Sequence, residues 1–347
     1  MKKKIITKIA ALCIAVVCAV GCSKDKKEVK FTDSQGKQQT IEIIRFDKLL
    51  FEKPLPNIED FLKNLQKQYP QMFQTTLDDR EYLSAVEQFI TDAQMQQVPG
   101  IVQRCYPDLN FLQQDLTSAF ARLSKQDTSV KLPEKVFSLI FGPADFSYSF
   151  ENRVYTNGQY SAISLDMYSF PQLDKHPYYQ HIPQYLQGTL NQRYIAPDFM
   201  RMYLKNIIYA HTADVNMNPD CTLLDCIVDE GKYTYILSKI MPEYKLYEIL
   251  RYTESQAKWV EDNEKTIWAY IVQNNLLYEK DRSKYMSLTA EGPTSKPLTD
   301  SPSRVGYYIG WKIVEGFMNN NHITFDSLMN IASSQTILNN SKYKPAK

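Results

Sequence analysis

The spacing of apolar residues changes twice along this chain of 347 residues, and that order restricts the folds open to it. The first part carries apolar residues with the period of amphipathic helices, and β-type runs replace them between residues 135 and 165. Asn157-Gly158 separates two of these runs and is typical of a tight hairpin turn. Beyond Pro197 the helical period returns. The order predicts a mostly helical α+β fold with a small antiparallel sheet.

Local signals give the expected bounds of individual elements. Thr253, with Gln256 three residues later, has the pattern of a capping box, which predicts a helix start at Thr253. Residues 280–303 are polar, contain three prolines and predict a long loop. The expected helices are 58–69, 81–97, 110–124, 197–211, 222–240, 253–274, 304–319 and 325–338, and the expected strands are 39–46, 135–141, 147–155 and 159–165.

The first 22 residues have the pattern of a bacterial lipoprotein signal. Four lysines accompany an apolar run from Ile9 to Val20, and the small residue Gly21 stands directly before Cys22. Such a signal is cut before the cysteine, whose thiol is then lipidated and whose amine is usually acylated. The run is shorter than the roughly 20 apolar residues that a membrane-spanning helix needs. We therefore predict a signal peptide over 1–21 and a lipid anchor at Cys22.

The charge pattern beyond the anchor separates a tether from a folded domain. Residues 23–30 are mostly charged and contain no apolar cluster, so we predict a tether over 22–38 and a single domain over 39–340. Without the signal, 36 basic and 39 acidic residues remain, a net charge of −3. This balance lacks the basic excess of nucleic-acid-binding proteins, and the sequence contains no glycine-rich phosphate-binding motif. We expect no nucleic-acid partner and no cofactor.

Three cysteines lie beyond the anchor, namely Cys105, Cys221 and Cys226. Three thiols cannot all pair, so no disulfide framework is expected. Cys221 and Cys226 are five residues apart, which is not the C-x-x-C spacing of redox and zinc sites, and on one helix they would point to different faces. The sequence favours buried free thiols at these positions.

Two of the expected helices allow a comparison with zinc peptidases of the gluzincin type. Those enzymes bind zinc through two histidines of an H-E-x-x-H helix and a glutamate of the next helix. Here His211 takes the place of the second histidine and Glu230 that of the glutamate, whereas Ile207 and Ile208 replace the first histidine and the catalytic glutamate. The spacing predicts a peptidase-like scaffold without a working zinc site. The alternatives are a polar His211 near a helix end and a Glu230 that pairs with a nearby cation or caps the backbone.

The same part of the chain resembles one family, the gliding-motility-associated lipoprotein GldB and its relatives in Bacteroidetes. The resemblance runs from Arg45 to about Asn319. It rests on Arg45-Phe46-Asp47, Leu223-Leu224-Asp225, Glu230-Gly231-Lys232, Tyr252-Thr253, Asn263-Glu264, Ile267-Trp268, Leu276-Leu277-Tyr278, Gly292-Pro293, Arg304-Val305-Gly306 and Gly310-Trp311-Lys312-Ile313-Val314. The resemblance implies a membrane-anchored envelope lipoprotein that supports surface motility and the secretion machinery linked to it. It supplies no catalytic residue, and it implies a distant similarity to zinc proteases with a degenerate site.

Our leading hypothesis is therefore a non-catalytic envelope lipoprotein, not an enzyme, that binds another envelope protein. We expect it at the outer membrane, on the periplasmic face or at the cell surface. One alternative is a zinc-dependent hydrolase whose ligands are misaligned in the comparison above. Another is a surface lipoprotein that binds glycans or peptides through aromatic side chains, since Trp259, Trp268 and Trp311 all lie in the last third of the chain.

Overall fold

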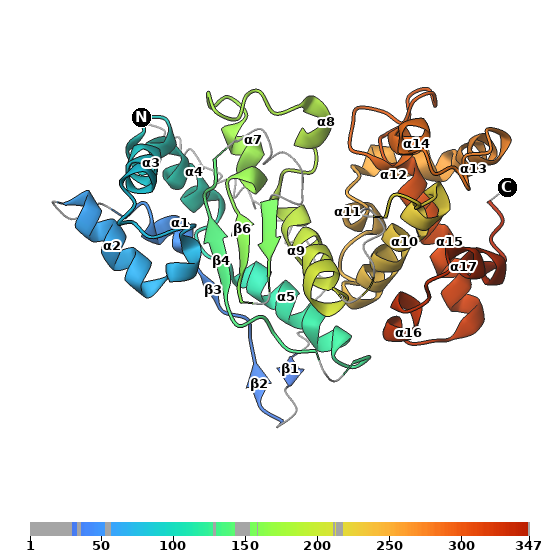
Figure 1. The fold of residues 1–347 in the computed structure, drawn as a ribbon, viewed down its shortest axis with the longest axis horizontal. Coiled ribbons are helices and arrows are strands. Elements are labelled where there is room, and N and C mark those ends of the chain that lie inside the picture. Colours follow the sequence, from blue (N-terminus) through green and yellow to red (C-terminus); the bar gives the residue numbers. More distant parts are fainter. Residues whose placement is uncertain are drawn as a thin grey trace, which may run out of the picture.

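The computed structural model describes residues 30–32, 36–52, 57–127, 130–142, 153–157, 159–210, 212 and 218–345. Figure 1 shows three parts along the longest axis, with the first helices at one end, a sheet in the middle and the last helices at the other end. The first part contains α1 (Phe46–Leu49), α2 (Ile58–Gln68), α3 (Arg80–Thr91) and α4 (Val98–Cys105). The middle contains α5 (Asn110–Leu123), β4 (Val136–Leu139), β5 (Val154–Thr156), β6 (Ser161–Ser164), α7 (Phe170–Leu173), α8 (Gln184–Gln187) and α9 (Ile195–Tyr203).

The last part is built from helices alone in the residues that the structure describes. They are α10 (Leu223–Ile240), α11 (Leu246–Ile249), α12 (Glu254–Asp262), α13 (Glu264–Gln273), α14 (Arg282–Thr289), α15 (Val305–Asn321), α16 (Phe325–Met329) and α17 (Ser334–Ser341). Within the described ranges, none of the helices combines the length and the apolar composition needed to cross a membrane.

The strands form two sheets, and the mostly helical α+β class is confirmed. A small antiparallel sheet pairs β1 (Phe31–Thr32) with β2 (Gln38–Gln39). The larger sheet has the order β3-β4-β6-β5, where β3 is Ile43–Ile44. It is mixed, because β3 and β6 both run parallel to β4 while β5 runs antiparallel to β6. The parallel pair of β3 and β4 joins strands that are far apart in the chain, with five α-helices described between them, a pairing that needs a long crossover connection.

The expected hairpin is confirmed between β5 and β6. The side chain of Asn157 accepts hydrogen bonds from the backbone N–H groups of Gln159 and Tyr160, each at 2.8 Å. The backbone N–H of Asn157 donates to the carbonyl of Tyr160 at 3.1 Å. Gly158 and most of the expected strand 147–155 lie outside the described residues.

Several helix expectations are confirmed, and others are wrong at their bounds. Thr253 forms the expected capping box with Gln256. The expected helix 253–274 is broken at Asn263, whose side chain donates to the Trp259 carbonyl and thereby ends α12. The expected loop 280–303 contains α14, because Asp281 caps its start and two apolar side chains of α14 are buried. Of the expected strand 39–46, Gln39 lies in β2 and Ile43–Ile44 form β3, and α1 already begins at Phe46.

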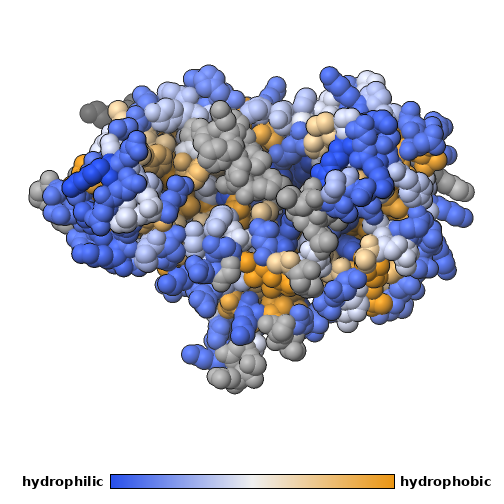
Figure 2. Space-filling view, in the orientation of Figure 1, coloured by the Kyte–Doolittle hydropathy of each residue, from blue (hydrophilic) through white to orange (hydrophobic). Residues whose placement is uncertain are grey.

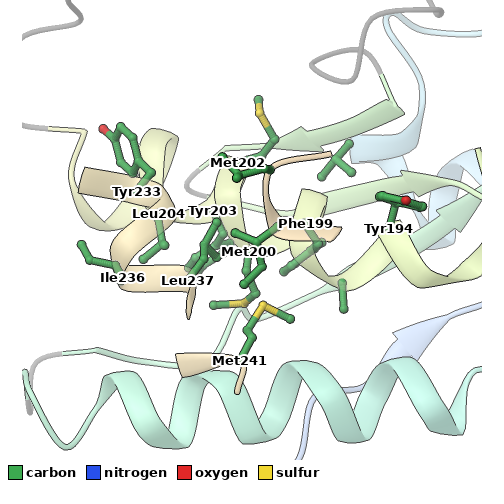
Figure 3. Close-up of a cluster of buried hydrophobic side chains, with 14 of the residues drawn as sticks. Tyr194, Phe199, Met200, Met202, Tyr203, Leu204, Tyr233, Ile236, Leu237 and Met241 are labelled. Carbon is green, nitrogen blue, oxygen red and sulfur yellow. The ribbon is translucent and has the colours of Figure 1, made fainter. Parts of the chain in front are cut away.

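The main core lies where α9 and α10 pack against each other and against α5. Figure 3 shows the side chains of Phe199, Met200 and Tyr203 from α9 pointing toward Leu237 of α10, and all four are buried. The ring of Tyr203 also meets that of Phe120 in α5 edge-on, with centroids 4.9 Å apart. Figure 2 shows hydrophilic residues over most of the surface on the face drawn, with hydrophobic residues near the lower centre, over α5. The core therefore joins the sheet part to the helical part.

The backbones of α10 and α15 approach each other closely. A Cβ atom on Gly231 would overlap the carbonyl of Gly310, and a Cβ atom on Gly310 would overlap the carbonyl of Ile227. Glycine is therefore required at both positions, because only a residue without a side chain lets the two backbones approach this closely.

The first prediction concerns this contact. We expect Gly310→Ala to lower the free energy of unfolding by about 3 kcal/mol or more, because the added methyl meets rigid backbone and forces the helices apart. Gly100→Ala is the matched control, since Gly100 is an exposed glycine of α4 whose added Cβ would meet only the end of Arg104, at 3.7 Å. The control should gain about 0.5–1 kcal/mol from helix propensity. Urea unfolding measures both, and equal stability of the two variants would contradict the proposed role of the glycine contact.

Candidate functional site: a buried arginine cluster and the start of α10

The zinc-peptidase comparison brought together Ile207, His211 and Glu230, and the structure describes Ile207 and Glu230 of these three. Cys22 and His211 lie outside the described residues, and Ile207 is half-buried at the end of α9, where the helix continues as a π-turn over Leu204–Ile208. Glu230 lies in α10 and forms an ion pair with Arg201 of α9, with 2.5 Å between Oε2 and Nη1. The structure thus contains the paired glutamate that was the alternative to a metal ligand. In the part of the chain that the structure describes, no group of three or more His, Cys, Asp and Glu side chains is placed to hold a metal ion.

Arg201 itself also joins α9 to a second residue of α10 and to α11. Its Nη2 donates to the hydroxyl of Thr234 at 3.2 Å and to the carbonyl of Ile249 at 2.9 Å. The Arg201 side chain is almost fully buried, so the Glu230 carboxylate compensates a charge that water does not reach. The charge of Glu230 is therefore used to stabilise the contact between α9 and α10.

A second group of charged side chains also involves α9 and is called here the arginine cluster. Its members are Arg153, Asp198, Arg251, Glu291 and Arg304. Arg251 is the centre, because its Nε lies 3.2 Å from Oδ1 of Asp198 and its Nη1 lies 2.8 Å from Oε1 of Glu291. Asp198 belongs to α9, Arg251 follows α11 and Glu291 follows α14. The cluster therefore connects three separate segments.

Two tyrosines complete the arginine cluster. Tyr168 donates to Oδ2 of Asp198 at 2.8 Å, and the guanidinium of Arg153 lies 5.8 Å from the centre of the Tyr168 ring. Tyr252 donates to the carbonyl of Arg304 at 2.9 Å, and its ring lies 5.7 Å from the Arg304 guanidinium. Both arrangements are cation–π contacts that favour a buried positive charge.

The neighbouring charges determine the ionisation of the carboxylate Glu291. Burial alone would raise the pKa of Glu291, but the guanidinium groups of Arg251, Arg304 and Arg153 outweigh burial and lower it. Glu291 therefore stays ionised at neutral pH. Burial, followed by the charge of Asp198, raises the pKa of Tyr168, so that this phenol stays protonated and continues to donate.

Two members of the arginine cluster have an unusual backbone. Arg251 and Arg304 both adopt left-handed conformations, each with a φ of 59°. Such conformations are uncommon for residues with a side chain and persist only where the surroundings hold them. The hydrogen bond from Nη2 of Arg304 to the carbonyl of Arg251, at 2.8 Å, links the two residues directly. With fixed guanidinium groups beside carboxylates and phenols, the cluster can compensate charge and hold segments together.

The start of α10 holds a loop that presents an exposed tyrosine. The N–H groups of Leu223 and Leu224 donate to the carbonyls of Glu279 and Leu277, at 3.1 and 2.9 Å. Between these two anchored carbonyls lies Tyr278, whose side chain is 59% exposed. The four residues 276–279, together with the N–H groups that hold them, are called here the α10 platform. Exposed Val272 and Met286 come from the same stretch of the chain.

A cavity of about 340 Å³ lies beside the start of α10. Its charged lining comes from Asp225, Asp229 and Lys232, and Cys221 also lines it. Burial lowers the pKa of Lys232, whose Nζ donates to the carbonyl of Ile331 at 2.8 Å. Asp225 closes a capping box with Thr222, so both Asp225 and Lys232 serve the local fold.

The sequence patterns indicated neither the arginine cluster nor the exposed position of Tyr278. Part of both could have been found from the family resemblance, because Tyr252, Arg304 and Tyr278 fall in the stretches that carry it. Arg153 and Asp198 lie outside those stretches.

The comparisons with known proteins give one match. The family described as "Gliding motility protein GldB" matches residues 24–345. Neither the curated proteins nor the solved structures contain a match to this chain. The similarity to zinc proteases is therefore not supported.

The second prediction concerns the arginine cluster. We expect Arg251→Met to lower the free energy of unfolding by about 3–5 kcal/mol, because it leaves the buried carboxylate of Asp198 without its cation. The matched control is Lys258→Met, which breaks the exposed pair of Lys258 and Asp262 and should change nothing measurable. Urea unfolding compares the two. If Arg251→Met were as stable as the control, the cluster would not be what connects the segments.

Proposed function

Since the chain belongs to the GldB family of gliding motility proteins, we propose that it is a non-catalytic lipoprotein that binds another protein of the cell envelope. The observation that carries the proposal is the extent of the family match, which covers residues 24–345 and so begins two residues after Cys22. The family itself is a gliding motility component and not a known class of enzyme. Membership of this family supports a location of the protein in the cell envelope.

We propose that the anchor is a lipid on Cys22 in the outer membrane. The lysine-rich start, the apolar run and the Gly21-Cys22 pair support this site. A single acyl chain binds a membrane only marginally, so stable anchoring needs acylation of both the thiol and the amine.

We propose a short tether between the anchor and the fold. Phe31 is buried, and its strand β1 pairs with β2, so the ordered chain includes part of the segment 22–38. We propose that the free tether ends at Lys30. From Cys22 to Phe31 an extended chain spans at most about 30 Å, which keeps the β1–β2 sheet close to the membrane surface.

The proposal that the protein is non-catalytic is supported by the use of Glu230. A zinc ligand needs a free carboxylate, and that of Glu230 is engaged by the guanidinium of Arg201. The carboxylates of the arginine cluster are likewise paired, since Arg251 binds both Asp198 and Glu291. These charges support the fold.

We propose that Tyr278 on the α10 platform contacts the partner. A tyrosine whose two chain neighbours each accept a backbone hydrogen bond from the start of α10 offers a large apolar surface that loses little freedom on binding. Val272 in α13 and Met286 in α14, the helices before and after Tyr278 in the chain, are also about half exposed.

The third prediction tests the anchor. We replace residues 1–22 with a cleaved secretory signal that carries no lipid-attachment cysteine. The unaltered protein should sediment with membranes and require detergent for release, whereas the replaced form should be recovered in the soluble envelope fraction. Cys105→Ser is the control, because it removes a thiol from α4 and should leave the protein in the membrane fraction. Recovery of the replaced form with membranes would show that Cys22 is not the anchor.

The fourth prediction tests the partner surface. A photoreactive phenylalanine analogue placed at Tyr278 in cells should give one discrete cross-linked product with an envelope protein. The same analogue at Tyr155, a 51% exposed residue of the edge strand β5, is the matched control and should give none. A product of equal yield at both positions would contradict the assignment of Tyr278.

Two further results would contradict the proposed function itself. A capture from solubilised membranes that recovers no reproducible protein partner would contradict the binding role. Stoichiometric zinc in the purified protein, lost in Glu230→Ala or His211→Ala, would instead favour the hydrolase alternative.

A further inference from the structure

We propose that Cys221 and Cys226 form a disulfide bond in the exported protein and that this bond locks the start of α10. Their sulfur atoms lie 2.8 Å apart. Nonbonded heavy atoms usually make contact at about 3.5–4 Å, whereas a disulfide bond is about 2.05 Å long. The two sulfurs are therefore already closer than ordinary contact, and a movement of less than about 1 Å would join them.

The position of Cys221 explains why the sulfur atoms meet despite their spacing. Two residues five apart on one helix would point to different faces, as expected from the sequence. However, α10 begins at Leu223 after the N-cap Thr222, so Cys221 lies in the preceding loop and Cys226 in the helix. The two side chains therefore do not share one helix, which was the condition for their expected divergence, and their sulfur atoms meet.

The surroundings of the two sulfurs are specific to this pair. Both cysteines are buried, and the hydroxyl of Tyr285 lies 3.6 Å from the Cys226 sulfur and donates to the Cys221 carbonyl at 3.3 Å. Tyr285 belongs to α14 and is itself buried. The pair is therefore enclosed between the start of α10 and α14.

The ionisation of Cys221 indicates when the bond would form. Burial, followed by the neighbouring sulfur of Cys226, raises the pKa of Cys221 to about 12. In the folded, reduced protein its thiol is thus protonated and attacks disulfides slowly, although a helix N-terminus alone would favour the thiolate. We infer that the bond forms while the exported chain folds, before the pair is buried.

The oxidation is balanced by a disulfide-bearing donor protein of the envelope. One cysteine thiolate attacks the donor disulfide, which forms a mixed disulfide and releases one donor thiol. The second cysteine then attacks the mixed disulfide and expels the other donor thiol. The two cysteines lose two electrons and two protons, and the donor gains them. This step relies on the proposed export, because oxidising envelope compartments allow disulfides to persist.

The bond would stabilise the α10 platform. Its ring contains residues 221–226 and so encloses the capping box of Thr222 and Asp225. The ring also contains Leu223 and Leu224, whose N–H groups hold the loop around Tyr278. Reduction of the bond would therefore loosen the support of the proposed partner surface.

The test uses the full chain taken from the envelope fraction and denatured in the presence of a thiol-reactive maleimide. Both cysteines fall in one tryptic peptide, residues 206–232. We expect Cys105 to be labelled at once, and Cys221 and Cys226 only after reduction, with the unreduced peptide lighter by about 2 Da than its reduced form. In Cys221→Ser the remaining Cys226 should be labelled without reduction, whereas Cys105→Ser should leave the peptide oxidised. Labelling of Cys221 and Cys226 in the unreduced, unaltered protein would overturn the inference.

A second measurement separates this inference from the proposed location. The purified, unaltered chain is unfolded and refolded in a buffer of reduced and oxidised glutathione. Closure of the 221–226 pair there supports the disulfide even if cell fractionation finds the protein outside the envelope, which would contradict only the export. A pair that remains reduced after refolding overturns the disulfide whatever the location.

Discussion

The close contact of α10 with α15 is the constraint on which the rest of the structure depends. Gly231 and Gly310 allow the two backbones to approach so closely that a single methyl group on either would overlap the other helix. This contact fixes the rotation of α10 about its own axis. Once that rotation is fixed, Glu230 and Lys232 are directed to opposite partners, the former to Arg201 of α9 and the latter to the carbonyl of Ile331. The glycine contact thus bears on where two charges lie.

The arginine cluster extends the same arrangement to the beginning of α15. Arg304 directly precedes α15 in a left-handed conformation, donates to the carbonyl of Arg251 and packs on the ring of Tyr252. Desolvation of buried charges offsets much of the attraction within such a cluster, so its members contribute more to a unique arrangement than to net stability. Removal of one partner remains costly, because the charge left behind is buried. The cluster therefore specifies how α9, the segment after α11 and the start of α15 meet.

Local interactions explain which parts could be predicted from the sequence. Helices α2, α5, α10 and α15 and the β5–β6 hairpin depend on apolar period, caps and a turn dipeptide, all of which are visible within a short window. The parallel pairing of β3 with β4 depends on residues about ninety positions apart, and no local signal encodes it. The arginine cluster is of the same kind, since its members range from Arg153 to Arg304 and meet only in the folded chain. Glu230, the counterpart of the glutamate ligand in the zinc-peptidase comparison, lies in the expected helix, but its charge is used by Arg201, a residue that the zinc-peptidase spacing does not include.

The same features that support the fold bear on the proposed function. A surface that binds a partner gains affinity when its contact residues are already ordered, because less conformational entropy is lost on binding. Tyr278 is exposed, yet the residues on either side are held by the start of α10, and α10 is held in turn by its glycine contact with α15. The contact between the two helices thus also restricts the backbone that carries an exposed aromatic side chain. An enzyme of the gluzincin type would instead need its second helix to offer a free carboxylate, which the ion pair of Glu230 with Arg201 opposes. The use of α10 as a fixed support is therefore the physical argument that favours binding over catalysis.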